Sequence, residues 1–581
     1  SSSMMQHGDD IQSAGHSAGR IGRRKGYDVH DQIPATHWCV TRGDLAKLRK
    51  AVRQAVDDGH IKPTRLDPFD PADDIIGPNV HTVVAQMLIP LSTLVGGPSW
   101  ALIQHPEGLE CDLFVTHGWL EGIFEFIDKL SCSWPAGRKH AWCCMLSNPQ
   151  SLDLERMIVD PATSPFAEAL ANAACILVVP NQHGSIFQRV WCTYEAYLAL
   201  RLDKTVLIAQ APLPRQCWWE VFFMALLFLI SAFLNAIFIP WRFTRAYNLS
   251  VNLLLPIAIL LRPSARYPNF IVNILGLVTS ASFTGLLVVT PLDFTVSAFD
   301  VCPSVTRRAT YLIIFGVARG CLFMVSHIDH RRYMHFQKEA GLLQSGYSGR
   351  VRDANATKTQ DKSMILQEIR STSDEAHVDQ TIAVLLKSGM YTPSLRVAYE
   401  RGVDISGVGL IFWKHLGIIA FICLRFLRQR AVSKLSADWA AIIVCLACLV
   451  FWLFRMKASI GQRDQPAFLA RVAWKFVGLP ACVYFLIVSI LWMIGGSRLN
   501  DPIKRAFGNV VLPSGCCCAA LLSMMNFGTV ASTPCVGVRL AQFLAANDIG
   551  TSLHACWRQI GATQRPLHQH AVELQKLYRR Q

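Results

Sequence analysis

The segment Phe187–Leu198 reads FQRVWCTYEAYL and does most to decide the fold of this 581-residue chain. It follows an apolar run, Ala174–Pro180, whose length and composition predict a buried strand. Its own apolar residues recur at helical spacing, so the two segments predict a strand–loop–helix unit. Glu195 lies four residues after Trp191 on the same face of that helix, where a carboxylate needs a partner or a function.

Residues 110–212 alternate between strand and helix patterns on both sides of this segment. Apolar runs predict strands at 112–117, 141–146, 174–180 and 205–209, with amphipathic segments between them. Ser164-Pro165 predicts a helix start, because serine is a good N-cap and proline fits the first helical position. This order predicts an α/β domain with a parallel sheet and right-handed crossovers.

Polar residues follow the predicted strands where a ligand would bind. In an open parallel sheet, ligands bind beyond the carboxyl ends of the strands. Three loops lie there, at 117–119, 147–150 and 181–184, and the next helix adds Arg189 and Glu195. We therefore expect one site that contains His117, Trp119, Asn148, Gln150, Arg189, Trp191 and Glu195.

Two motifs resemble the TIR-type domain: the strand Cys111–His117 and the helix motif Trp191-Cys-x-x-Glu195. The resemblance covers 110–210. The whole chain is more similar to a group of protist multi-pass membrane proteins with an N-terminal TIR-like domain. The motifs that carry this second resemblance are His117-x-Trp119, Trp142-x-Cys144, Asn148-x-Gln150, Asp160-Pro161, Ser164-Pro165-Phe166 and Arg189-x-Trp191-Cys192.

The resemblance implies a TIR-like, flavodoxin-like fold and a candidate activity. Glu195 would be the catalytic residue of an NAD glycohydrolase, with His117 beside it. The nucleotide would be bound by Trp119, Asn148, Gln150, Arg189 and Trp191. NAD would then be a substrate, and neither a resident cofactor nor a metal is expected. The alternatives are structural: Glu195 pairs with Arg189 or His117, and Trp191 is a core aromatic residue.

The composition indicates a membrane protein. The chain is 51% hydrophobic and 17% charged, with mean hydropathy +0.29. The apolar runs predict helical spans at 218–240, 247–261, 269–291, 309–328, 408–424, 438–454, 473–494 and 509–530. The second span is short for a bilayer, so the expected fold is an α/β domain followed by an all-α membrane domain of seven or eight helices.

These patterns divide the chain into seven predicted parts. They are a disordered tail at 1–30, a helical extension at 31–109, the TIR-like domain at 110–215, membrane helices 1–4 at 216–330, a soluble helical loop at 331–407, membrane helices 5–8 at 408–532 and a basic cytosolic tail at 533–581. The N-terminal tail has no apolar core typical of a signal peptide, so the TIR-like domain is expected in the cytosol.

The net charge and the cysteine spacing limit which binding partners and which metal or disulfide sites are expected. The net charge of +15 fits lysine and arginine that flank spans and contact membrane lipids. No basic stripe with interleaved aromatic residues appears, so nucleic acid is not expected as a partner. The 19 cysteines have no regular spacing, which argues against a disulfide framework or a zinc site.

Two functions fit these features. The first is a membrane signalling protein whose TIR-like domain binds a nucleotide or self-associates into a homo-oligomer, with NAD hydrolysis as its candidate chemistry. The second is a channel, transporter or membrane scaffold in which the TIR-like domain is only a protein-interaction module.

Overall fold

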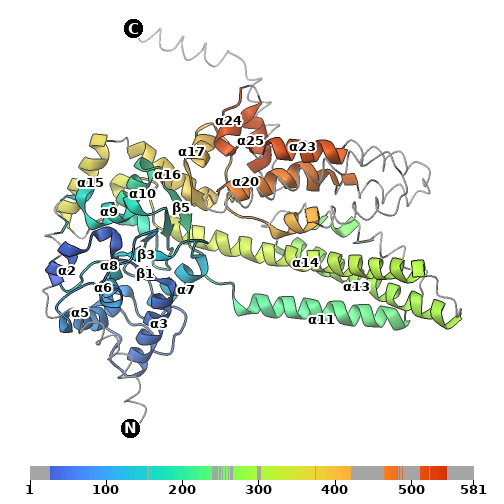
Figure 1. The fold of residues 1–581 in the computed structure, drawn as a ribbon, viewed down its shortest axis with the longest axis horizontal. Helices are drawn as coiled ribbons and strands as arrows, with labels where there is room; N and C mark the ends of the chain where they lie inside the picture. The colour runs from blue at the N-terminus through green and yellow to red at the C-terminus, as the bar shows by residue number, and fades with distance from the viewer. Residues whose placement is uncertain are drawn as a thin grey trace, which may run out of the picture. The chain divides into compact units, whose positions relative to one another are not determined.

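The computed structural model describes residues 26–545 except for 154–156, 159, 239–246, 248–249, 252, 256, 259–260, 262–265, 298–302, 357, 373–374, 421–463, 482, 485–486, 488–510, 523 and 535. The predicted span at 438–454, most of the tail at 1–30 and most of the tail at 533–581 therefore lie outside the described residues. The chain divides into two compact units (Figure 1). The α/β unit contains residues 1–212 and 335–396, and the helical unit contains 213–334 and 397–581.

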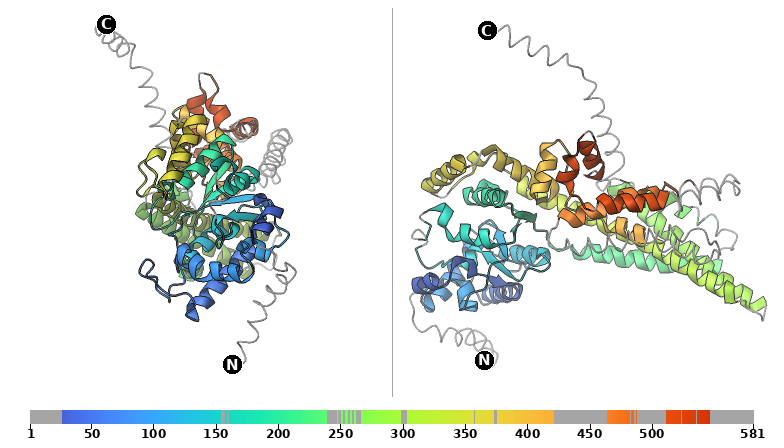
Figure 2. Two further views of the ribbon diagram at one scale, coloured as in Figure 1. Left: turned by 90° about the vertical axis from the view of Figure 1, so that its left-hand side faces the viewer. Right: turned by 45° about the horizontal axis from the view of Figure 1, so that its top comes forward.

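The α/β unit is built on a mixed six-stranded sheet with the order β1-β3-β2-β4-β5-β6. Its four central strands are parallel, as predicted. They are β2 (Leu113–Thr116), β3 (His140–Cys143), β4 (Cys175–Val178) and β5 (Thr205–Ile208). They consist almost entirely of buried residues, because helices cover both faces of the sheet (Figures 1 and 2).

The sheet is not purely parallel, and on this point the prediction was wrong. At one edge, β1 (Val40–Thr41) pairs antiparallel with β3. At the other edge, β6 (Met390–Tyr391) pairs antiparallel with β5. Both strands have only two residues, too few to show the alternation that identifies a strand in a sequence.

Helices cover the two faces of the sheet. One face carries α3 (Arg42–Asp57) and α7 (Ile123–Ser133), and the other carries α9 (Pro165–Asn172) and α10 (Val190–Arg201) (Figure 1). The Ser164 hydroxyl caps α9, as predicted. The other helices before β4 are α2 (Gly26–Gln32), η1 (Ala35–His37), α4 (Val80–Val83), η2 (Val84–Leu88), α5 (Ile89–Leu94), α6 (Trp100–Gln104), α8 (Cys144–Ser147) and η4 (Pro161–Thr163).

The helix that carries Glu195 begins later than its sequence predicts. The pattern predicts a start at 187–189, but a separate 3₁₀ turn, η5 (Ile186–Gln188), comes first. The Ser185 hydroxyl accepts a hydrogen bond from the Phe187 amide and so caps that turn. The α-helix α10 begins at Val190, which still places Glu195 within its first two turns.

Residues 335–396 complete the α/β unit. They contain the end of α14 (Pro303–Gln344), η7 (Val351–Asp353), α15 (Thr359–Thr372), α16 (Glu375–Ser388), β6 and the first residues of α17 (Pro393–Glu400). Gly389 ends α16 with φ 84°. The sequence predicted a separate soluble loop at 331–407. In the structure, residues 335–396 belong to the α/β unit, where α15 and α16 both pack on α10.

The helical unit contains α11 (Arg215–Phe238), α13 (Arg266–Ser297) and most of α14, followed by α20 (Asp464–Ala473), η8 (Trp474–Gly478), α23 (Leu512–Leu522), α24 (Phe527–Ala531) and α25 (Gly537–Ala545). Within the described residues, only α11 is both long and apolar enough to cross a membrane. A membrane domain of seven or eight helices is therefore not shown.

The other predicted spans differ in how far the structure describes them. Helices α13 and α14 each run without a break across the predicted spans 269–291 and 309–328. The predicted span 509–530 is broken, because α23 ends at Leu522 and the Asn526 side chain caps a new helix, α24. The spans predicted at 247–261, 408–424 and 473–494 are only partly described.

Candidate functional site

The carboxyl ends of the central strands meet at His117, the residue after β2. The Nδ1 atom of His117 lies 2.6 Å from Glu121 Oε1. Its Nε2 atom lies 3.0 Å from the sulfur of Cys144, the residue after β3. The Cys192 thiol on α10 donates to the His117 carbonyl at 3.7 Å. Strand ends and helix start therefore converge as the sequence predicted.

Burial and charge shape the titration of His117 and Glu121, whose side chains are each 1% exposed. Burial raises the pKa of Glu121 to about 7, although the His117 charge opposes this. Burial alone would lower the pKa of His117, but Cys144 and Glu121 outweigh it and raise that pKa well above its usual value. The two partners therefore favour the protonated form of His117.

Glu195 is buried on α10 and 7% exposed. Neither its Oε2 atom nor the Oγ1 atom of Thr116 has a hydrogen-bond partner among the described residues. Burial raises the pKa of Glu195 to about 7, and the Thr116 hydroxyl and the positive charges of His117 and Arg189 oppose this only in part. The ion pair considered from the sequence does not form, because His117 pairs with Glu121 instead.

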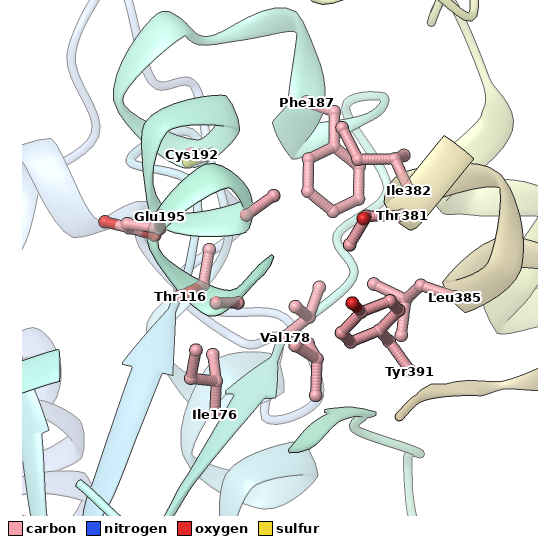
Figure 3. A pocket seen from close by; sticks show the side chains of 13 residues that line it. Thr116, Ile176, Val178, Phe187, Cys192, Glu195, Thr381, Ile382, Leu385 and Tyr391 are labelled. Atoms are coloured by element: carbon pink, nitrogen blue, oxygen red, sulfur yellow. The ribbon is translucent and has the colours of Figure 1, made fainter. Parts of the chain in front are cut away.

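The cavity beside Glu195 is small and mostly apolar (Figure 3). It has a volume of about 10 Å³, which is about the room one water molecule needs. Its wall includes Phe187, Ile382, Leu385 and Tyr391. The last three come from α16 and β6, so the segment 335–396 closes the space under α10. This cavity cannot hold a nicotinamide ring.

A larger cleft lies at the start of α10. It has a volume of about 380 Å³ and is lined by Arg189, Val190, Trp191, Asn355, Ala356 and Asp361. Trp191 is partly buried here, which agrees with the mostly buried residue that the helical stripe predicts. Its ring stacks on Phe166 at 5.4 Å, and its indole N–H donates to Asp361 at 3.1 Å. One side of the indole therefore meets a polar partner instead of the core.

The other predicted site residues support the loops around His117. Trp119 is partly exposed and contacts the His81 ring at 5.0 Å. The Gln150 amide donates to the carbonyls of Cys144 and Asn148 at 3.0 and 3.3 Å. Asn148 is buried at 3% exposure. Gln150 thus satisfies loop backbone, the structural role considered for it.

Sequence reasoning missed Glu121, Cys144 and Asp361. Glu121 follows His117 by four residues in a loop, where spacing does not reveal a contact. Cys144 lies inside the predicted strand 141–146, whereas β3 ends at Cys143 and Cys144 begins the helix α8. Asp361 is 170 residues from Trp191 in the chain, so only tertiary packing brings them together.

Comparisons with known proteins give no relative. No family model, no curated protein sequence and no solved structure matches this chain.

Replacing Glu195 with glutamine should stabilise the α/β unit above pH 7. The pKa of Glu195 rises from 4.5 to about 7 on folding, so its contribution is most favourable below pH 4.5 and is lost as the pH rises to 7. At about 1.4 kcal/mol per unit, the loss is roughly 3 kcal/mol at pH 8. Glu195→Gln removes it, which hydrogen exchange of the α10 amides at pH 5 and pH 8 can measure.

The critical observation is whether Glu195→Gln is more or less stable than the wild type at each pH. The variant should gain stability over the wild type at pH 8 and gain little at pH 5. A variant that is equally destabilised at both pH values would show that Glu195 is satisfied in its charged form, contrary to its unpaired Oε2 atom.

Proposed function

We propose that this chain is a membrane-anchored signalling protein whose TIR-like, flavodoxin-like α/β unit binds a nucleotide. The order of the four parallel strands supports this fold. Numbered along the chain from β2, they lie in the order 2-1-3-4, as in the first four strands of the flavodoxin type. In that type the ligand binds where the order reverses, between the first and third strands. Here those strands are β2 and β4, and His117 follows β2.

The cleft of about 380 Å³ at the start of α10 carries the proposal. Arg189 supplies a guanidinium group for phosphate, and Asp361 supplies a carboxylate that can accept from ribose hydroxyls. Trp191 supplies an aromatic edge. Trp191 belongs to the TIR-type helix motif, and Arg189 and Trp191 both belong to the motif shared with the protist membrane proteins. A cation, an indole and a carboxylate in one concave site match a nucleotide diphosphate better than an apolar ligand.

Binding is better supported than NAD hydrolysis. Glu195 does not line this cleft, and its own cavity of about 10 Å³ is too small for the nicotinamide ribose. The candidate activity as a TIR-type NAD glycohydrolase thus has a titratable carboxyl group but no room for substrate. The small cavity favours the second candidate function, a protein-interaction module, self-association included, on a channel, transporter or scaffold.

Membrane anchoring rests on α11. The most hydrophobic window of α11 is only 17% buried, and the helix exposes Trp218, Trp219, Phe222, Phe223 and Phe233. Such a surface fits contact with membrane lipids. We infer that α11 spans the bilayer, that further helices of the helical unit make the protein multi-pass, and that the α/β unit lies in the cytosol.

The test is calorimetric binding of ADP-ribose and NAD to the full chain in detergent. Arg189→Ala should weaken binding roughly 10- to 100-fold, the effect of losing a charged hydrogen bond to phosphate. The matched control is Arg201→Ala at the other end of α10, whose side chain is 47% exposed and pairs with Glu368 at 3.6 Å; it should bind like the wild type.

Two outcomes would overturn the proposal. Absence of binding by the wild-type chain would leave the interaction module. Equal losses in Arg189→Ala and Arg201→Ala would show that general charge, and not the cleft, attracts the nucleotide. Nicotinamide release measured in the same samples separates binding from hydrolysis, which Glu195→Gln should abolish if it occurs.

A further inference from the structure

We propose that Cys144 is a nucleophile activated by His117, so that the α/β unit carries a cysteine-dependent acyl-transfer site. The site is separate from the nucleotide cleft at Arg189 and does not depend on it. Its substrate class is an ester or thioester whose acyl group is transferred to the Cys144 sulfur.

Three side chains have the geometry of nucleophile, base and orienting carboxylate. The Cys144 sulfur lies 3.0 Å from His117 Nε2. The opposite ring nitrogen, Nδ1, lies 2.6 Å from Glu121 Oε1. A carboxylate at Nδ1 fixes the ring and leaves Nε2 free to take the thiol proton, which is the logic of catalytic triads. Glu121 is here a positioning residue, because it acts through His117.

The base and the carboxylate are buried, whereas the nucleophile is partly exposed. His117 and Glu121 have side chains that are 1% exposed, which shelters the base from water. Cys144 is partly exposed, unlike His117 and Glu121. His117 is held by both partners, and their charges favour its protonated form.

Other cysteines in the described residues lack this arrangement. Cys143 and Cys192 are buried, and burial raises the pKa of both thiols. The Cys192 sulfur contacts the backbone carbonyl of His117 and not its ring. Cys132 is exposed, but its pKa is raised by partial burial. Cys132 is therefore a matched reference thiol within the same unit.

Charged and titratable groups on several elements surround the Cys144–His117–Glu121 cluster and affect the pH dependence of its reactivity. They are Glu125 and Lys129 on α7, Cys143 on β3, Arg189 before α10, and Cys192 and Glu195 on α10. Among these, Glu195 also titrates near neutral pH, with a pKa of about 7.

The proposed reaction needs only the acyl donor and water. The Cys144 thiol gives its proton to His117 Nε2, and the sulfur attacks the acyl carbonyl carbon. A C–S bond forms, and the bond to the leaving group breaks with its electron pair, which takes up the proton from His117. Water then attacks the thioester, gives a proton to His117 and releases the acid. The sulfur leaves and regains that proton.

The first experiment measures alkylation by iodoacetamide in the full chain at pH 6.5, with the modified peptides identified by mass spectrometry. Cys144 should react about 5-fold or more faster than Cys132, because the His117 ring nitrogen 3.0 Å from its sulfur can take up the thiol proton. Equal rates would overturn the proposal. Glu121→Gln should move the pH profile of Cys144 towards higher pH and leave that of Cys132 unchanged.

The second experiment uses p-nitrophenyl acetate as the acyl donor. The wild-type chain should release a burst of one equivalent of p-nitrophenol and carry one acetyl group on Cys144. Cys144→Ser should lose the burst while keeping the wild-type hydrogen-exchange protection of the β2 and β3 amides, which shows that it is folded. Acetyl groups on exposed lysines without any on Cys144 would overturn the proposal, whatever the outcome of nucleotide binding.

Discussion

Replacing Trp142 with alanine should lower the stability of the α/β unit by about 3–5 kcal/mol, the usual cost of truncating a large aromatic residue in a core. Trp142 lies on β3 and is fully buried. Its indole stacks on Phe114 of β2 at 5.1 Å and meets the Phe166 ring edge at 5.2 Å. The truncation therefore opens a cavity between two central strands and α9.

Hydrogen exchange of the β2 and β3 amides in the full chain measures this effect. Trp191→Ala is the matched control, because Trp191 also contacts Phe166 but is only half-buried. We expect roughly 1–2 kcal/mol for the control, within the ordinary range for single substitutions. Equal losses in the two variants would mean that Trp191 belongs to the core after all.

Replacing Lys129 with methionine should cost about 3–5 kcal/mol, because removal of one partner leaves buried charges without compensation. The Lys129 side chain on α7 is 2% exposed. Its ammonium group lies 2.8 Å from Glu125 and 2.7 Å from Glu339, and it donates to the Pro180 carbonyl at 2.8 Å. Two carboxylates and a strand-end carbonyl thus depend on one cation.

Hydrogen exchange of α7 in the full chain is again the measurement. Lys47→Met is the control: Lys47 pairs with Asp44 at 3.5 Å, but its side chain is 73% exposed, so the change should be within about 0.5 kcal/mol. Adding Glu339→Gln to Lys129→Met should recover part of the loss. If the double variant is no more stable than Lys129→Met, the loss comes from packing and not from charge.

Local sequence determined the central part of the fold. The four parallel strands were predicted because each is an apolar run of strand length between amphipathic segments. The helix start near Ser164 was predicted because an N-cap acts on the amides within a few positions of it. The topology followed from right-handed crossovers, and it correctly placed His117 and the start of α10 at the same edge of the sheet.

The helical unit shows where composition alone falls short of predicting helix ends. Total hydrophobicity predicts apolar helices, but it does not say where they end. Asn526 starts a new helix inside the predicted span 509–530, after α23 has ended at Leu522. A single capping side chain can start a new helix inside a segment whose mean hydropathy predicts one unbroken span. It does so because it satisfies a free backbone amide in the first turn of that helix.

The tertiary structure decided the chemistry of the site. Glu121 and Cys144 become partners of His117 because a loop and two strand ends fold onto one point, and no periodic pattern records such contacts. Residues 335–396 supply β6, the lid over the Glu195 cavity and Asp361 beside Trp191, and they contact α10 across more than 130 residues of sequence. Sequence determines secondary structure through neighbours within a few residues, whereas exposure and pairing depend on contacts between distant segments.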